Sequence, residues 1–85
     1  MKKFTYIIKD ETGIHARPAG LLVKAAEKFS SSVKLECGGK SADGKKLFSV
    51  MSLGAKCGAE VIVTVEGTDE DEASAALESF FGQNL

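Results

Sequence analysis

The sequence is poor in the residues that mark metal-binding and disulfide-rich proteins. Among 85 residues it has no tryptophan, one proline, one histidine and two cysteines. Cys37 and Cys57 stand outside any CxxC spacing, and together with a single histidine they form no recognisable ligand set. We therefore expect no metal site, no cofactor, and free thiols in a reducing cytoplasm.

Long hydrophobic runs and a large net charge are also missing. No apolar run approaches the ~20 residues that a bilayer-spanning helix needs. The 11 Lys and Arg residues nearly balance the 12 Asp and Glu residues, which leaves a net charge of −1. Such a chain creates no strong field toward nucleic acid or a membrane surface. We expect one domain over residues 1–85, monomeric and cytoplasmic, with no nucleic-acid binding and no membrane insertion.

Hydrophobic periodicity predicts seven elements, in the order strand, helix, strand, strand, helix, strand, helix. Alternating runs predict strands at residues 3–8, 33–37, 40–42 and 60–66. Spacings of three and four predict helices at residues 16–28, at 47–53 and from Asp69 to Phe81. Asp69 and Glu72 resemble a capping box, and the β-branched content of residues 60–66 favours a central strand. The order favours an α+β fold, an open two-layer sandwich with the helices on one face of an antiparallel sheet.

The only histidine stands at the predicted start of the first helix, in the run Gly-Ile-His-Ala-Arg-Pro-Ala at residues 13–19. The first N–H groups of a helix lack intrahelical partners, so the amides of Ala16 and Arg17 can hold phosphate oxygens. The positive helix end favours a neutral His15, whose ring nitrogen then has a lone pair for attack on phosphorus. Arg17 offers two parallel donors to a phosphoryl dianion. Taken alone, a His-x-Arg pair is more often a helix cap beside a solvated arginine.

This run resembles the active-site motif of the HPr-type histidine phosphocarriers of the bacterial phosphoenolpyruvate-dependent sugar phosphotransferase system. A second run, Val-Met-Ser-Leu-Gly at residues 50–54, is also similar to that family, and the likeness covers nearly the whole chain. The resemblance implies a βαββαβα fold with sheet order 1423 and three helices on one face. It implies that enzyme I phosphorylates His15 on Nδ1 and that enzyme IIA domains accept the phosphoryl group. The protein would then be a carrier and not a stand-alone enzyme.

The resemblance also implies a docking surface beside the histidine. In the predicted second helix Val50 and Leu53 can face the sheet, which leaves the other apolar residues on the opposite side. A short isolated helix more often buries all of its apolar residues, so it is the resemblance that favours docking. The residues expected to meet the partners are Gly20, Lys24, Leu47, Phe48 and Met51.

One position departs from the family pattern. Many members carry a regulatory serine just before the second helix, and here that position is Lys46. Lysine caps a helix less well than serine, and with Lys40 and Lys45 it adds local positive charge. We expect that a regulatory seryl kinase does not modify this chain at or near Lys46, and phosphate on Ser49 or Ser52 would contradict this expectation.

Two other kinds of protein share part of the pattern. RNA-binding modules with a β-α-β-β-α-β order stack bases on aromatic residues of their central strands, but residues 40–42 contain no aromatic residue and the chain has no GXXG loop. A regulatory binding protein on the same scaffold, which contacts enzymes or transcriptional regulators without carrying phosphate, is the second alternative. The presence of His15 weighs against it.

Overall fold

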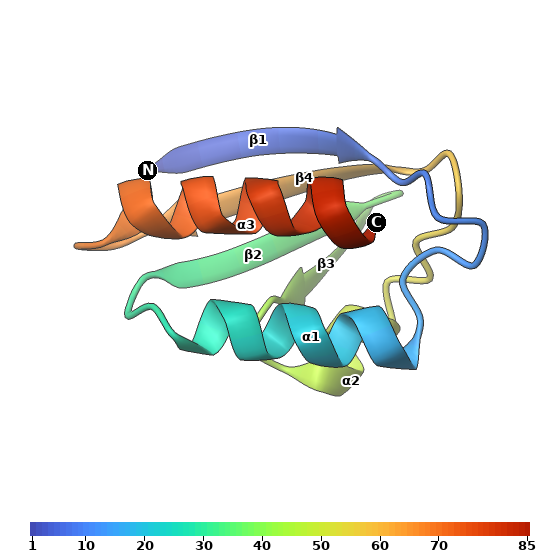
Figure 1. Cartoon of the computed structure of the whole chain (residues 1–85), viewed down its shortest axis with the longest axis horizontal. Helices are drawn as coiled ribbons and strands as arrows, with labels where there is room; N and C mark the ends of the chain where they lie inside the picture. Colours follow the sequence, from blue (N-terminus) through green and yellow to red (C-terminus); the bar gives the residue numbers. More distant parts are fainter.

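The computed structural model describes residues 1–85 and contains the seven elements in the predicted order (Figure 1). The strands are β1 (Lys2–Ile7), β2 (Ser32–Cys37), β3 (Lys40–Asp43) and β4 (Glu60–Glu66). The helices are α1 (Ala16–Glu27), α2 (Leu47–Met51) and α3 (Glu70–Asn84). No helix combines the length and the apolar character that crossing a membrane would require.

The four strands form one antiparallel sheet in the order β1-β4-β2-β3, as predicted. β4 lies between β1 and β2, with Val63 paired to Phe4 on one side and to Leu35 on the other. Val61, Val63 and Val65 are fully buried. The prediction of a central β4 is confirmed, because its β-branched side chains fill the middle of the core.

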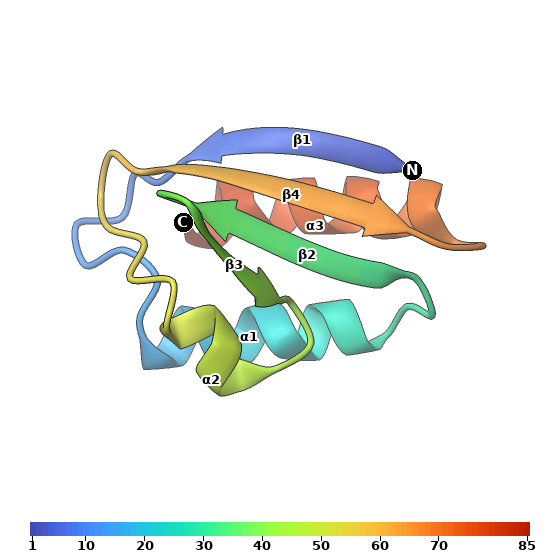
Figure 2. The same cartoon turned by 180° about the vertical axis from the view of Figure 1, so that it is seen from behind.

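The helices lie on one side of the sheet and leave its other face open. α1 and α3 lie side by side in front of the sheet in Figure 1, and Figure 2 shows the uncovered face from behind. α2 packs against α1 and β3 at the edge of the sheet. Phe81 of α3 is fully buried, and its ring meets the edges or faces of Phe4 and Tyr6 at centroid distances of 5.8 and 5.4 Å. The predicted open two-layer sandwich is confirmed.

α2 is two residues shorter than predicted. Its last regular residue is Met51, after which the Leu53 amide bonds the Val50 carbonyl and the Gly54 amide bonds the Met51 carbonyl. These are tighter turn bonds than those of an α-helix. Gly54 then adopts a φ of 63°, which glycine tolerates best, so the backbone leaves the helical path.

The capping box predicted for α3 does not form. Asp69 precedes the helix but makes no side-chain cap hydrogen bond. Its carboxylate instead accepts hydrogen bonds from the amides of Ser30 and Ser31, each at 2.9 Å, and from both serine hydroxyls. The bonds from Ser31 and Ser30, the Ser31 hydroxyl first, lower the pKa of Asp69 to about 2. Asp69 therefore ties the segment after α1 to the start of α3.

Candidate functional site

The loop between β1 and α1 carries His15 and is fastened to two other parts of the molecule. The amides of Lys9 and Asp10 donate to the carbonyl oxygen of Leu85 at 2.6 and 2.8 Å. The Ile14 amide donates to the Ala55 carbonyl oxygen at 2.9 Å. Gly13 has a φ of 68°, and a Cβ there would lie 2.7 Å from the Cα atom of Lys56. The entry into α1 is thus held against residues that are distant in sequence.

His15 occupies the N-cap position of α1 with an extended backbone, at φ −122° and ψ −171°. Its side chain is exposed and makes no cap hydrogen bond. His15 therefore holds the N-cap position through its backbone alone, and its side chain does not cap the helix. The imidazole is exposed at the start of the helix.

Three consecutive backbone amides at the start of α1 have no hydrogen-bond acceptor within the chain. The N–H groups of His15, Ala16 and Arg17 donate no hydrogen bond within the chain, and Pro18 has no N–H group. The first bond of the helix runs from the Ala19 amide to the His15 carbonyl at 2.9 Å. Free amides at the positive end of a 12-residue helix are the arrangement that holds anionic oxygens.

His15 and Arg17 share an open hollow of about 320 Å³, which we call the His15 hollow. Its lining residues are Asp10, His15, Arg17, Pro18, Leu21 and Asn84. Arg17 is exposed and takes part in none of the three ion pairs of the structure. Its guanidinium is therefore available to an incoming anion.

Three residues of the hollow were missed by sequence reasoning. Leu21 follows Arg17 by one helical turn and is 44% exposed, which makes it an apolar neighbour that the helical spacing could have revealed. Asn84 reaches the hollow from the end of α3, where its side-chain amide donates to the Phe80 carbonyl at 3.1 Å. No local sequence pattern predicts a role for Asn84, because only the packing of α3 against α1 brings it to the His15 hollow.

Asp10 is the third missed residue, and it brings a negative charge to the hollow. Its carboxylate accepts hydrogen bonds from the Thr12 hydroxyl at 2.7 Å and from the Thr12 amide at 2.9 Å. The hydroxyl, then the amide, lower the pKa of Asp10, and attraction to His15 adds to this effect. Asp10 therefore stays ionised beside His15 at neutral pH.

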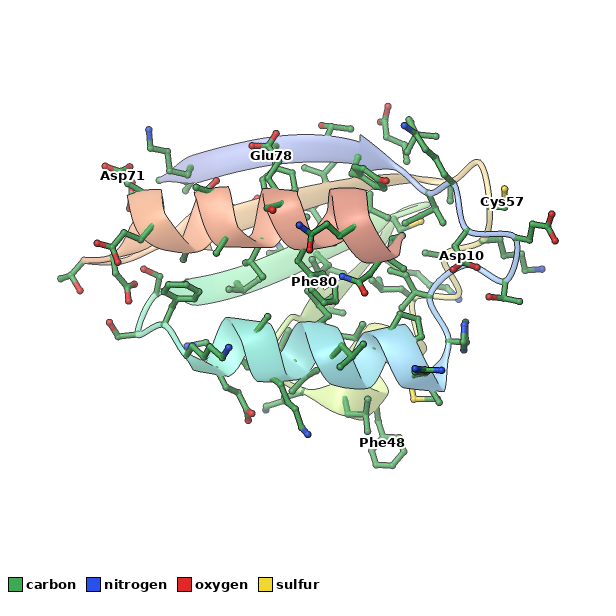
Figure 3. The ribbon with its side chains drawn as sticks, viewed as in Figure 1. Asp10, Phe48, Cys57, Asp71, Glu78 and Phe80 are labelled. Atoms are coloured by element: carbon green, nitrogen blue, oxygen red, sulfur yellow. The ribbon has the colours of Figure 1, made fainter.

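The predicted docking residues, which we call the docking patch, lie on two helices that pack together, α1 and α2. Phe48 is 80% exposed and points away from the molecule (Figure 3), while Leu47 is 37% exposed. Lys24 is exposed and Gly20 is half-buried on α1. Met51 is half-buried against the core and is less accessible than the helical spacing indicated. Val50 and Leu53 are buried, as their spacing predicts.

Lys46 lies at the N-cap of α2 and makes no side-chain cap hydrogen bond. Lys45, next to it, donates from its ammonium group to the Phe29 carbonyl after α1, at 2.7 Å. The expected group of three lysines is therefore divided. Lys45 holds the end of α1, while Lys40 and Lys46 remain exposed without an ion-pair partner.

Comparison with known proteins shows the family to which this chain belongs. The family model described as the PTS HPr component phosphorylation site matches residues 2–83. The structure is similar to HPr-C-His from Thermoanaerobacter tengcongensis, with 46% identity, a TM-score of 0.87 and coverage of 100% of both chains. It is similar to the histidine-containing phosphocarrier protein of Mycoplasma, with 38% identity and a TM-score of 0.90, over 93% of this chain and 90% of that one.

A third relative is Crh, the catabolite repression containing protein of Bacillus subtilis, whose structure is described as an intertwined dimer with a swapped domain. It is 36% identical with a TM-score of 0.78, over 94% of this chain and 92% of that one. The family match covers nearly the whole chain, and these relatives share its fold and more than a third of the aligned residues. The chain therefore belongs to the HPr family of histidine-containing phosphocarriers.

Proposed function

We propose that this chain is a monomeric cytoplasmic phosphocarrier of the phosphoenolpyruvate-dependent sugar phosphotransferase system. It accepts a phosphoryl group on His15 from enzyme I and passes it to enzyme IIA domains. The observation that carries the proposal is the free imidazole of His15, which stands beside three unpaired amides and an arginine without an ion-pair partner. A site with this composition suits a phosphoryl group and needs no cofactor.

The proposed transfer step uses these groups, with Nδ1 as the attacking atom because the family resemblance implies it. The lone pair of His15 Nδ1 forms the new N–P bond, while the bond between phosphorus and the donor atom of enzyme I breaks. The electron pair of the broken bond stays with the donor, and the other ring nitrogen of His15 keeps its proton. The amides of Ala16 and Arg17 and the Arg17 guanidinium then hold the three phosphoryl oxygens.

The second transfer requires that the phosphoryl group leave again. An open hollow at the junction of a loop and a helix exposes the phosphoryl group to an acceptor. Stabilisation by free amides and one guanidinium is moderate, which keeps the phosphorylated form from becoming a dead end. These features favour a relay over a hydrolase with a closed pocket.

Docking of the partners is assigned to the docking patch. Phe48 and Leu47 supply exposed apolar surface, the exposed Lys24 supplies a positive charge, and Leu21 extends the surface toward the His15 hollow. A relay requires brief encounters, so we expect each interface to bury less than roughly 1,200 Å² in total. Enzyme I and the IIA domains would use the same surface in turn.

A regulatory binding protein is the second candidate function. Its support is the 36% identity to Crh, the catabolite repression containing protein of Bacillus subtilis. Such a protein would contact transcriptional regulators or enzymes through the docking patch and would not need a phosphoryl acceptor. The unpaired His15 and Arg17 favour the carrier, because a surface used only for binding has no need of them.

The deciding experiment incubates the protein with enzyme I, Mg²⁺ and phosphoenolpyruvate and follows the intact mass. The carrier gains the mass of one phosphoryl group, loses it in acid, and transfers it when an enzyme IIA domain is added. His15→Ala serves as the matched control and should stay unlabelled. Labelling of His15→Ala to the wild-type extent, or no labelling of the wild-type protein, would overturn the proposal.

A further inference from the structure

Asp10 introduces a charge into the His15 hollow that the proposed transfer does not require. It lies in the loop between β1 and α1 (Figure 3) and lines the same hollow as His15 and Arg17. Its carboxylate has no cationic partner, since none of the three ion pairs includes it. The only groups that bond its side chain are the hydroxyl and the amide of Thr12.

The turn that Asp10 forms does not need this charge. The bond from the Thr12 amide to the Asp10 side chain is a local turn that asparagine makes equally well with its carbonyl oxygen. The backbone is held independently, because the Asp10 amide donates to the Leu85 carbonyl and the Asp10 carbonyl accepts from the Gly13 amide. The negative charge is therefore separable from the structural role of the residue.

The negative charge of Asp10 interacts with the charge carried by His15, which differs between its free and phosphorylated forms. A free His15 adds at most one positive charge to the hollow, whereas a phosphorylated His15 adds about two negative charges. Arg17 attracts that dianion and Asp10 repels it. Two groups of opposite sign thus act on one phosphoryl group from the same small hollow.

We infer that Asp10 limits the stability of phosphorylated His15 through charge repulsion and so raises the tendency of the phosphoryl group to move to an acceptor. The inference rests on the proposed function, since it assumes that His15 carries phosphate. Asp10 does not touch the reacting atoms and is not a catalytic residue. It sets the balance between the free and the phosphorylated carrier, while the bonds formed and broken remain those of the transfer step.

The expected magnitude is moderate. A carboxylate and a dianion that line the same largely aqueous hollow repel each other enough to change an equilibrium about threefold to tenfold. Because the hollow is open to solvent, salt screens the repulsion. The effect is therefore large enough to measure and should weaken as the ionic strength rises.

The test is a competition between two carriers. Isotope-labelled wild-type protein and unlabelled Asp10→Asn are mixed in equal amounts with catalytic enzyme I and limiting phosphoenolpyruvate, and intact mass gives the phosphorylated fraction of each. Asp10→Asn should have a ratio of phosphorylated to free protein about threefold to tenfold higher at about 20 mM salt, and the difference should shrink toward about 0.5 M. Glu11→Gln, which removes an exposed neighbouring charge outside the hollow, should change the ratio less than about twofold.

An equal share of phosphoryl groups, or a larger share on the wild-type protein, would overturn the inference. A second measurement removes the dependence on enzyme I: both proteins are phosphorylated chemically with phosphoramidate and titrated by phosphorus NMR. Loss of the Asp10 charge should lower the pKa of the phosphoryl group, and an unchanged pKa would again contradict the inference. Failure of enzyme I to label the wild-type protein would therefore overturn the proposed function, while the chemical phosphorylation would still test the effect of Asp10 on phosphorylated His15. Thermal unfolding of Asp10→Asn confirms that the turn is intact.

Discussion

Replacing Gly13 with alanine tests how the fold holds the histidine in place. Gly13 combines two features that an alanine cannot accept together: a φ of 68° and a backbone neighbour where its Cβ would be. The added Cβ would lie against the Ala55 carbonyl oxygen and 2.7 Å from Lys56 Cα, well inside ordinary van der Waals contact. The loop before His15 would have to move away from residues 55–56.

The magnitude has a conformational part and a steric part. Placing a side chain at positive φ costs about 1 kcal/mol. Moving the loop strains or breaks the 2.9 Å hydrogen bond from the Ile14 amide to Ala55, which adds about 1 kcal/mol, and residual overlap adds more. We therefore expect Gly13→Ala to lower the free energy of unfolding by about 2 to 4 kcal/mol. In a domain of this size that corresponds to a fall in Tm of about 10 to 20 °C.

Two further glycines provide matched controls for urea and thermal unfolding. Gly54 has a similar φ of 63° but open space where its Cβ would lie, so Gly54→Ala should show only the conformational cost of about 1 kcal/mol. Gly82 lies in α3 with open space around it, so Gly82→Ala should stabilise the protein by about 0.5 to 1 kcal/mol. Equal losses for Gly13→Ala and Gly54→Ala would refute the steric argument.

Three other predictions concern the Asp69 carboxylate, the Arg17 guanidinium and the docking patch. The pKa of Asp69 is lowered to about 2 from an ordinary 3.8, so its contribution to stability is present above about pH 4 and is lost as the pH falls toward 2. Between about pH 4 and pH 2 the urea midpoint of Asp69→Asn should therefore fall less than that of the wild-type protein. Parallel plots of urea midpoint against pH would contradict the stabilising role of the Asp69 charge. Arg17→Lys keeps the charge but loses the planar fork, so phosphoryl transfer in both directions should slow roughly tenfold to a hundredfold by rapid-quench measurement, and unchanged rates would remove its role. Phe48→Ala removes a side chain that is 80% exposed, so the free energy of unfolding should change by less than about 0.5 kcal/mol. The KM for the carrier in the enzyme I reaction should rise at least about fivefold, because an exposed aromatic anchor of the docking patch is lost. An unaltered KM would place docking elsewhere.

Local patterns predicted the elements well where burial repeats with a regular period. β4 was predicted as Glu60 to Glu66 and has these bounds, because its alternate valines face the core. The ends of elements were less predictable. The predicted α2 ran to Leu53, but hydrogen bonds tighten after Met51 and the chain turns at Gly54. Such an ending depends on backbone geometry that hydrophobic spacing does not describe.

Polar side chains were harder to assign, because more than one partner satisfies the same spacing. Asp69 and Glu72 have the separation of a capping box, yet the Asp69 carboxylate bonds the amides and hydroxyls of Ser30 and Ser31, nearly forty residues earlier. Lys45 was expected to add to a basic turn, and its ammonium instead bonds the carbonyl of Phe29. These partners become available only when α1, α2 and α3 pack around the sheet.

Local spacing in the sequence was enough to predict the main groups of the candidate site. His15, Arg17 and the free amides lie within one turn of a helix start, and the lack of amide partners there follows from helix geometry alone. The other residues around them come from distant parts of the chain. It brings the end of α3 and the Asp10 turn to the same hollow and holds Gly13 against residues 55–56, because contacts between distant segments depend on how the helices and the sheet pack. The exposed histidine and its unpaired amides could thus be predicted from local spacing, whereas the Asp10 charge in the same hollow could not.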